Sequence, residues 1–208
     1  MKPQRIVPVL LLVVTVIALL VPVARAQSPD TPAFAARGPY PVGVREFVIA
    51  DDERPLPVTV WYPALNPTDA PESTVYLPDL FPIPGQAIAD APPDVAGGPY
   101  PLVIFSHGFG GFRYQSTYLT EHLASYGFVV MSADHPGSTF LDLLGDDVPL
   151  DEVRQMLTGS GSEGELLERL MERGRAERGL EPISVSLALR PLDVLREIAF
   201  AETLTAAD

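Results

Sequence analysis

The sequence predicts an α/β protein with a mostly parallel sheet and antiparallel strands at the N-terminal side, because three patterns follow one another in its middle. The first is a short apolar run, Leu102–Phe105, typical of a strand buried on both faces. A glycine-rich turn and a helical pattern over 114–123 come next, and a second apolar run follows at Phe128–Met131. Strand, turn, helix and strand in this order predict a βαβ unit with two parallel strands.

The helix of this unit is expected to pack on the sheet through a stripe of larger side chains. The stripe repeats at three- and four-residue steps: Tyr114, Tyr118, Leu119, His122 and Leu123. Gly127 predicts the C-terminal end of the helix, since glycine readily adopts the left-handed conformation that stops a helix.

The first 26 residues have the pattern of a secretory signal peptide. They contain a basic start, an uncharged apolar run and a small-x-small cleavage site: Lys2 and Arg5, residues 6–21, and Ala24-Arg25-Ala26. The apolar run contains Pro8 and is shorter than the about 20 residues that a membrane span requires. We therefore expect cleavage after Ala26, a secreted or periplasmic product and no stable membrane span after cleavage. An uncleaved membrane anchor is the alternative.

The mature chain divides into a leader and one domain. Residues 27–41 are rich in proline and alanine and predict a flexible leader, and 42–208 form the domain. In this domain, 44–49 and 56–62 predict an antiparallel hairpin across a short polar turn. The proline-rich stretch 66–99 predicts a long connection without a helix or a central strand.

Helical patterns return after Gly137. Short amphipathic pieces are expected at 140–144 and 150–157, and a charged helix at 163–178. The last helix is expected at 185–200, with Pro191 beginning a new helix in its first turn. Its apolar residues recur at helical spacing and predict the face that packs on the sheet: Leu187, Leu192, Leu195, Ile198 and Ala199.

Composition argues against several classes of function. The chain has 208 residues, a formal net charge of −13 and no cysteine. Lys and Arg do not cluster in any segment of the sequence, so we expect no nucleic-acid partner. Without cysteine, there is neither a disulfide framework nor a thiol nucleophile. The three histidines are too few and too scattered for a metal centre, and we expect no metal and no cofactor. Oligomeric state has no signal in the sequence.

Several motifs resemble the α/β-hydrolases, and more closely their dienelactone hydrolase-like branch, which includes platelet-activating factor acetylhydrolases and bacterial polyester esterases. The motifs are the S-H-G-x-G turn at Ser106–Gly110, the L-A-S-x-G-[FY]-V helix ending at Leu123–Val129, the pair Asp134-His135, and the R-x-x-D pair Arg190 and Asp193. The resemblance extends over about residues 39–200 and concerns the N-terminal portion of such a hydrolase.

This resemblance implies a carboxylic ester hydrolase that uses a Ser-His-Asp acyl-enzyme mechanism on short-acyl lipids or on other small or polymeric esters. It implies that the N–H of Phe109 is one oxyanion donor, that Gly108 and Gly110 shape the turn, and that His135 lines the cleft.

The catalytic serine of such a hydrolase is missing from the chain. No serine has glycine both two residues before and two residues after it, so the G-x-S-x-G motif is absent. We therefore expect no catalytic triad residue within the chain, a nucleophile, acid and histidine downstream of Asp208, and no activity of these 208 residues alone. The alternative is a secreted, non-catalytic binding protein that reuses half the fold, with the acidic segment 141–181 as its binding surface.

Overall fold

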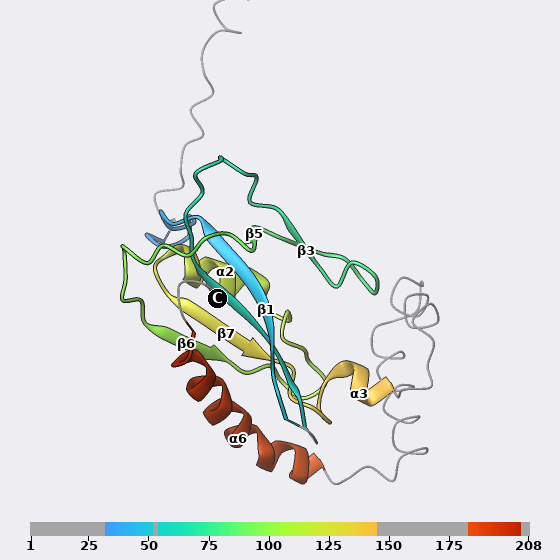
Figure 1. Cartoon of the computed structure of the whole chain (residues 1–208). Coiled ribbons are helices and arrows are strands. Elements are labelled where there is room, and N and C mark those ends of the chain that lie inside the picture. The colour runs from blue at the N-terminus through green and yellow to red at the C-terminus, as the bar shows by residue number, and fades with distance from the viewer. Residues whose placement is uncertain (1–31, 52–53, 145–182, 205–208) are drawn as a thin grey trace, which may run out of the picture. The chain divides into compact units, whose positions relative to one another are not determined.

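The computed structural model describes residues 32–51, 54–144 and 183–204 (Figure 1). Contacts divide the chain into two units, residues 1–36 and 37–208. In the first unit the described residues form a turn in which the Ala35 N–H donates to the Pro32 carbonyl at 3.0 Å. The signal peptide and the helical pieces expected at 150–157 and 163–178 lie outside the described residues. No helix in the described ranges is long and apolar enough to cross a membrane.

A five-stranded sheet in the order β5-β1-β2-β7-β6 organises the second unit (Figure 1). The strands are β1 (Val42–Ile49), β2 (Leu56–Pro63), β5 (Ile88–Ala89), β6 (Leu102–Phe105) and β7 (Val129–Ala133). β2 is antiparallel to β1 and to β7, whereas β1 and β5 are parallel, as are β6 and β7. Four of the five strands thus run in one direction, which confirms the α/β class, the N-terminal hairpin and the parallel βαβ unit.

The proline-rich connection contains no helix, as predicted. Within it β3 (Thr74–Tyr76) pairs with β4 (Ile83–Gly85) apart from the main sheet. β5 lies at one edge of the described sheet. A proline-rich segment is tolerated at an edge because an edge strand forms backbone hydrogen bonds on one side only.

One expectation for β6 is wrong: the strand is not buried on both faces. It lies at the end of the described sheet, its residues are only partly buried, and Leu102 is 39% exposed. No strand of the described residues pairs with its outer edge.

Helix α2 (Thr117–Ser125) covers one face of the sheet and ends as predicted, with Gly127 at φ 93° and its N–H donating to the Ala124 carbonyl at 3.0 Å. The predicted stripe is confirmed only in part: Tyr114 and Leu123 belong to the core, whereas Tyr118 is 77% exposed. The buried residues of the helix are instead Thr117, Thr120, Glu121, Ala124 and Ser125. Small side chains let the helix approach the sheet closely, and Glu121 is tolerated there because the Tyr76 hydroxyl donates to its Oε1 at 2.6 Å.

Helices α3 (Phe140–Leu144) and α6 (Ile183–Ala201) complete the described structure. The C-terminal part of α6 packs Phe200 against the sheet face that includes Met131, opposite the face that holds Trp61 and α2 (Figure 1).

Two expectations for α6 are wrong. The helix runs through Pro191 instead of beginning there. Its predicted packing face is exposed, with Leu192 and Leu195 54% and 60% accessible, while Asp193 and Glu197 are buried. The charged face turns inward because Asp193 has cationic and imidazole partners on the other elements.

Candidate oxyanion turn and its polar network

The S-H-G-x-G turn lies where the two parallel strands end. Residues 106–111 follow β6, and residues 134–139 follow β7 beside them. Gly111 bridges to Thr139, and the Gly110 N–H donates to the Ser138 carbonyl at 2.9 Å. The carboxyl ends of parallel strands are where α/β sheets bind ligands, so the geometry places this motif at the expected edge.

The N–H groups of the turn have unequal environments. Gly108 donates to the side-chain oxygen of Gln115 at 3.3 Å, and Gly111 donates to the Gly108 carbonyl at 2.9 Å. Gly110 is bonded to Ser138, so the N–H of Phe109 lies between bonded N–H groups on both sides and itself has no hydrogen-bond partner among the described residues. An unbonded, accessible N–H at a strand end is the group that an oxyanion requires.

The two glycines on either side of Phe109 differ in backbone conformation and in the space available for a side chain. Gly110 has φ 73°, a conformation that favours glycine, and an added Cβ would lie 3.2 Å from Cδ1 of Leu143. An added Cβ at Gly108 would meet nothing within 4 Å. Gly110 therefore fixes the shape of the turn, and Gly108 leaves space beside the free N–H.

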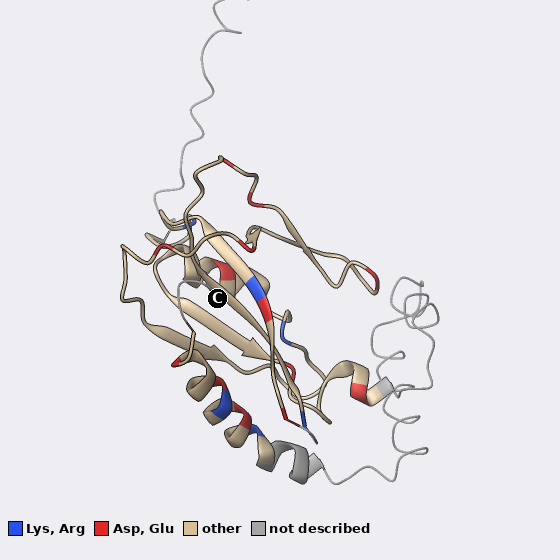
Figure 2. Cartoon of the chain, viewed as in Figure 1, with Lys and Arg blue, Asp and Glu red and all other residues tan. Residues whose placement is uncertain are grey.

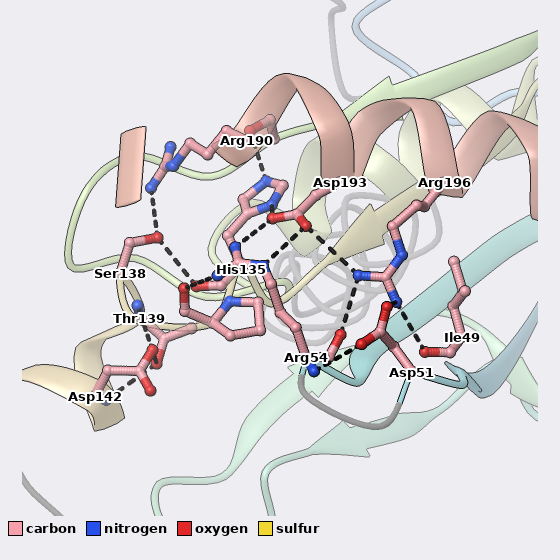
Figure 3. Close-up of polar contacts among 12 residues, drawn as sticks. Ile49, Asp51, Arg54, His135, Ser138, Thr139, Asp142, Arg190, Asp193 and Arg196 are labelled. Carbon is pink, nitrogen blue, oxygen red and sulfur yellow. Dashed lines mark hydrogen bonds and ion pairs between the residues drawn. The ribbon is translucent and has the colours of Figure 1, made fainter. Parts of the chain in front are cut away.

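His135 lies at the centre of a chain of polar side chains that begins at this turn (Figure 3). Its Nε2 is 2.8 Å from Oγ of Ser106, and its Nδ1 is 3.0 Å from Oδ2 of Asp193. An ionised carboxylate only accepts, so Nδ1 carries the proton and Ser106 donates to Nε2. The family resemblance implies that His135 lines a cleft; its ring has no exposed surface and faces Ser106 and Asp193 instead.

Asp193 is held by arginines as well as by His135. Nη2 and Nε of Arg54 lie 2.7 and 3.3 Å from the two carboxylate oxygens, and Nη1 of Arg196 lies 3.8 Å away (Figure 3). Arg54 also donates to the Pro136 carbonyl at 3.0 Å. Asp193 is 1% exposed, so this pairing compensates a carboxylate that is almost completely removed from water.

The second histidine of the region, His107, is also buried. The backbone N–H of His135 donates to its Nε2 at 3.2 Å, and its Nδ1 lies 2.7 Å from the Gly108 carbonyl. Nε2 must therefore be the acceptor and Nδ1 the donor. Burial lowers the pKa of both histidines, which favours the neutral rings that these contacts require.

Arg190 connects helix α6 to both sides of the turn. Its guanidinium donates to the His107 carbonyl at 2.5 Å and to Oγ of Ser138 at 3.0 Å. Figure 2 shows that basic and acidic residues share the described part of α6. The R-x-x-D motif pointed to Arg190 and Asp193, but the sequence alone could not identify His107, His135, Ser138 or Arg54 as their partners.

Two hollows among the described residues differ in size and in their distance from the turn. The larger, of about 410 Å³, is lined by Tyr62, Leu102 and Val129 among others, at the starts of β6 and β7 and away from the turn. The smaller, of about 50 Å³, is lined by Phe112, Phe140 and other apolar residues, and also by Arg113 and Asp134. The smaller hollow is lined by residues that follow the turn and β7, and by no residue of 106–111. In the described ranges, no three His, Asp or Glu residues converge as metal ligands.

The comparisons with known proteins agree with these motifs. Residues 85–140 match the family model of platelet-activating factor acetylhydrolase, isoform II. This segment contains the turn and the Asp134-His135 pair. The resemblance to an α/β-hydrolase of the platelet-activating factor acetylhydrolase-like branch, over a part of the chain, is thereby confirmed.

Individual relatives match over limited lengths. The platelet-activating factor acetylhydrolase of Gallus gallus is 28% identical over 49% of this chain and 29% of its own length. Those of Cavia porcellus and Bos taurus are 49% and 35% identical over 19% and 39% of this chain, and over 9% and 17% of their own. The chain thus spans less than a third of each relative. A solved structure of ferulic acid esterase from Streptomyces cinnamoneus is 28% identical, with a TM-score of 0.40, over 64% of this chain and 50% of that chain.

Proposed function

We propose that this chain is part of an exported carboxylic ester hydrolase in which the N–H of Phe109 stabilises the oxyanion. The observation that carries the proposal is the unbonded N–H of Phe109, which lies between the bonded N–H groups of Gly108 and Gly110. The match of residues 85–140 to an acetylhydrolase family supports the reaction class. The signal-peptide pattern, with cleavage after Ala26, supports export to the periplasm or the medium.

The proposed reaction follows the acyl-enzyme sequence. A serine Oγ attacks the ester carbonyl carbon while a histidine takes its proton, and the carbonyl oxygen becomes anionic beside the Phe109 N–H. The alcohol then leaves with that proton, and water hydrolyses the acyl-serine. No serine of this chain stands in a G-x-S-x-G motif, so we assign the nucleophile and its two partners to residues outside these 208. By this proposal, the 208 residues alone are inactive.

The small hollow after the turn supports the substrate class that we propose. About 50 Å³ lined by Leu80, Phe112 and Phe140 suits a short acyl chain better than a long one. We therefore propose short-acyl lipids or related small esters as substrates. The alternative, a non-catalytic binding protein, rests on segment 141–181, of which only residues 141–144 are described.

The test compares two substitutions of Phe109 in the product of the complete reading frame. Phe109→Pro removes the N–H, whereas Phe109→Ala removes the ring and keeps the N–H. With p-nitrophenyl acetate and butyrate, we expect Phe109→Pro to lower kcat by about 10²-fold or more, and Phe109→Ala to change it far less. Equal kcat values for the two variants would overturn the assignment of the donor. Absence of any ester hydrolysis by the wild type would overturn the proposed function.

A further inference from the structure

The direction of the Phe109 N–H is set by the carbonyl on the same peptide bond. The Gly108 carbonyl accepts from Nδ1 of His107 at 2.7 Å and from the N–H of Gly111 at 2.9 Å. In a planar trans peptide the C=O and the next N–H point in opposite directions. The two contacts that hold the Gly108 oxygen therefore turn the Phe109 N–H away from His107 and Gly111, towards the open side of the turn.

His107 is held in turn on three sides. Its Nε2 accepts the backbone N–H of His135, its carbonyl accepts from Arg190, and the residue is 1% exposed. His135 is fixed by Ser106 on one ring nitrogen and by Asp193 on the other. A continuous set of hydrogen bonds therefore connects the carboxylate of Asp193 on α6 to the Gly108–Phe109 peptide.

We propose that His107 is a positioning residue for the oxyanion donor, and that His135 and Asp193 hold it in the neutral Nδ1–H form. His107 touches no reacting atom; it acts by holding the Gly108–Phe109 peptide in one orientation. This inference rests on the proposed esterase function and adds the residues that orient its oxyanion donor. Preorganised donors are effective because they need no reorientation when charge develops on the substrate.

The surroundings of His107 disfavour its protonated form. Burial is the largest cause and Arg190 of α6 adds to it, while the carboxylates of Asp134 and Asp142 act in the opposite direction; the His135 ring lies beside that of His107, with ring centroids 5.0 Å apart. A proton added to Nε2 would point at the N–H of His135 and remove the acceptor of this N–H. Burial lowers the pKa of His107, in agreement with a neutral ring.

Ser106, His135 and Asp193 have the hydrogen-bond order of a catalytic triad, but burial argues for a structural role. A general base must pass its proton to the leaving group, and the His135 ring has no exposed surface through which a leaving group would approach. In this arrangement Ser106 is a donor that completes the fixation of His135, not a nucleophile.

The kinetic test uses three histidine variants of the complete protein. His107→Leu removes both ring contacts, His107→Asn keeps a donor near the position of Nδ1, and His122→Asn on α2 is the matched control. We expect His107→Leu to lower kcat by about tenfold to a hundredfold with little change in KM, His107→Asn to retain more activity, and the control to match the wild type. Equal kcat values for the Leu and Asn variants, or an unchanged kcat in His107→Leu, would overturn the proposal.

A second test needs neither a variant nor turnover. Ring ¹⁵N NMR of the wild type at pH 7 is expected to find His107 and His135 neutral, with the proton on Nδ1. A proton on Nε2 of His107 would overturn the proposal. So would labelling of Ser106 by a fluorophosphonate, because Ser106 would then be a nucleophile. A wild type that hydrolyses no ester would overturn the proposed function and this role with it, whereas an active wild type with an unaffected His107→Leu overturns this role alone.

Discussion

The carboxylate of Asp193 lies 2.7 Å from Nη2 of Arg54, although 139 positions separate the two residues in the sequence. Arg54 precedes β2, and Asp193 lies on the buried face of α6. The pair therefore attaches α6 to the sheet by charge, while the same carboxylate accepts from His135. A single buried group thus supports both the fold and the candidate site.

Replacing Asp193 by Asn is expected to destabilise the fold strongly. The amide can still accept from His135 but no longer neutralises Arg54, and loss of hydrogen bonds between charged groups costs about 1.5–3 kcal/mol. The control is Asp90→Asn, which affects an 84% exposed carboxylate 3.9 Å from Arg45 and should cost less than about 1 kcal/mol. Urea unfolding measures both variants. Similar losses for the two would contradict the importance of the buried pair.

The stability of the fold should fall as the pH rises, because the buried carboxyl group of Glu197 must lose its proton. Glu197 is fully buried, its carboxylate oxygens have no hydrogen-bond partner among the described residues, and burial with nearby Asp193 raises its pKa from 4.5 to about 8. Between these values the unfolded chain releases a proton that the folded chain keeps. The contribution of Glu197 is therefore complete below pH 4.5 and is lost towards pH 8, by at most about 1.4 kcal/mol per pH unit.

Glu197→Gln tests this contribution because the amide is neutral at every pH. The difference in unfolding free energy between the wild type and the variant, measured from pH 5 to pH 8.5, should shift steadily in favour of the variant. A constant difference across this range would show that Glu197 does not titrate in the way its burial implies.

Much of the fold follows from local patterns in the sequence. The hairpin, the βαβ unit and the end of α2 at Gly127 were predicted because alternation, short apolar runs and glycine act within a few residues. The face of α6 was not, and that of α2 only in part, because periodicity identifies an apolar stripe without saying what covers it. On α6 the stripe containing Leu195 is exposed, and Asp193 is buried by partners distant in the sequence.

The candidate site was predictable only in part, for the same reason. The glycine motif located the turn, and the resemblance named Phe109 as the donor. The orientation of that donor depends on His107, whose contacts come from residues 135 and 190, and no local pattern signals such a contact. The tertiary structure determines which residues of a buried network form hydrogen bonds with each other. The sequence can therefore suggest the residues but not their partners.

Substituting Gly110 by Ala should impair the turn more than the same change at Gly108. Gly110 has φ 73°, which costs a residue with a Cβ about 1–2 kcal/mol, and its Cβ would press on Leu143. Gly108 has open space at that position, so Gly108→Ala should change the unfolding free energy little. Urea unfolding and ester hydrolysis by the complete protein measure the two effects. If both variants behave alike, the special conformation of Gly110 is not what shapes the site.

The Tyr76 hydroxyl should contribute to the stability of the core because it forms hydrogen bonds with two buried side chains. It accepts from Nε1 of Trp61 at 2.8 Å and donates to Oε1 of Glu121 at 2.6 Å. Tyr76→Phe keeps the ring but leaves both partners unsatisfied, which costs about 1–3 kcal/mol. Tyr118→Phe is the control, since Tyr118 is 77% exposed and its loss should cost less than about 0.5 kcal/mol.

Trp61 is the only tryptophan of the chain, so its fluorescence reports this unfolding directly. The Tyr76→Phe protein should unfold at a lower urea concentration than the control, with the same dependence on urea. Burial already raises the pKa of Glu121, and loss of the donated hydrogen bond should raise it further. The variant should therefore lose more stability at pH 8 than at pH 5, and a loss independent of pH would contradict a further rise in the pKa of Glu121.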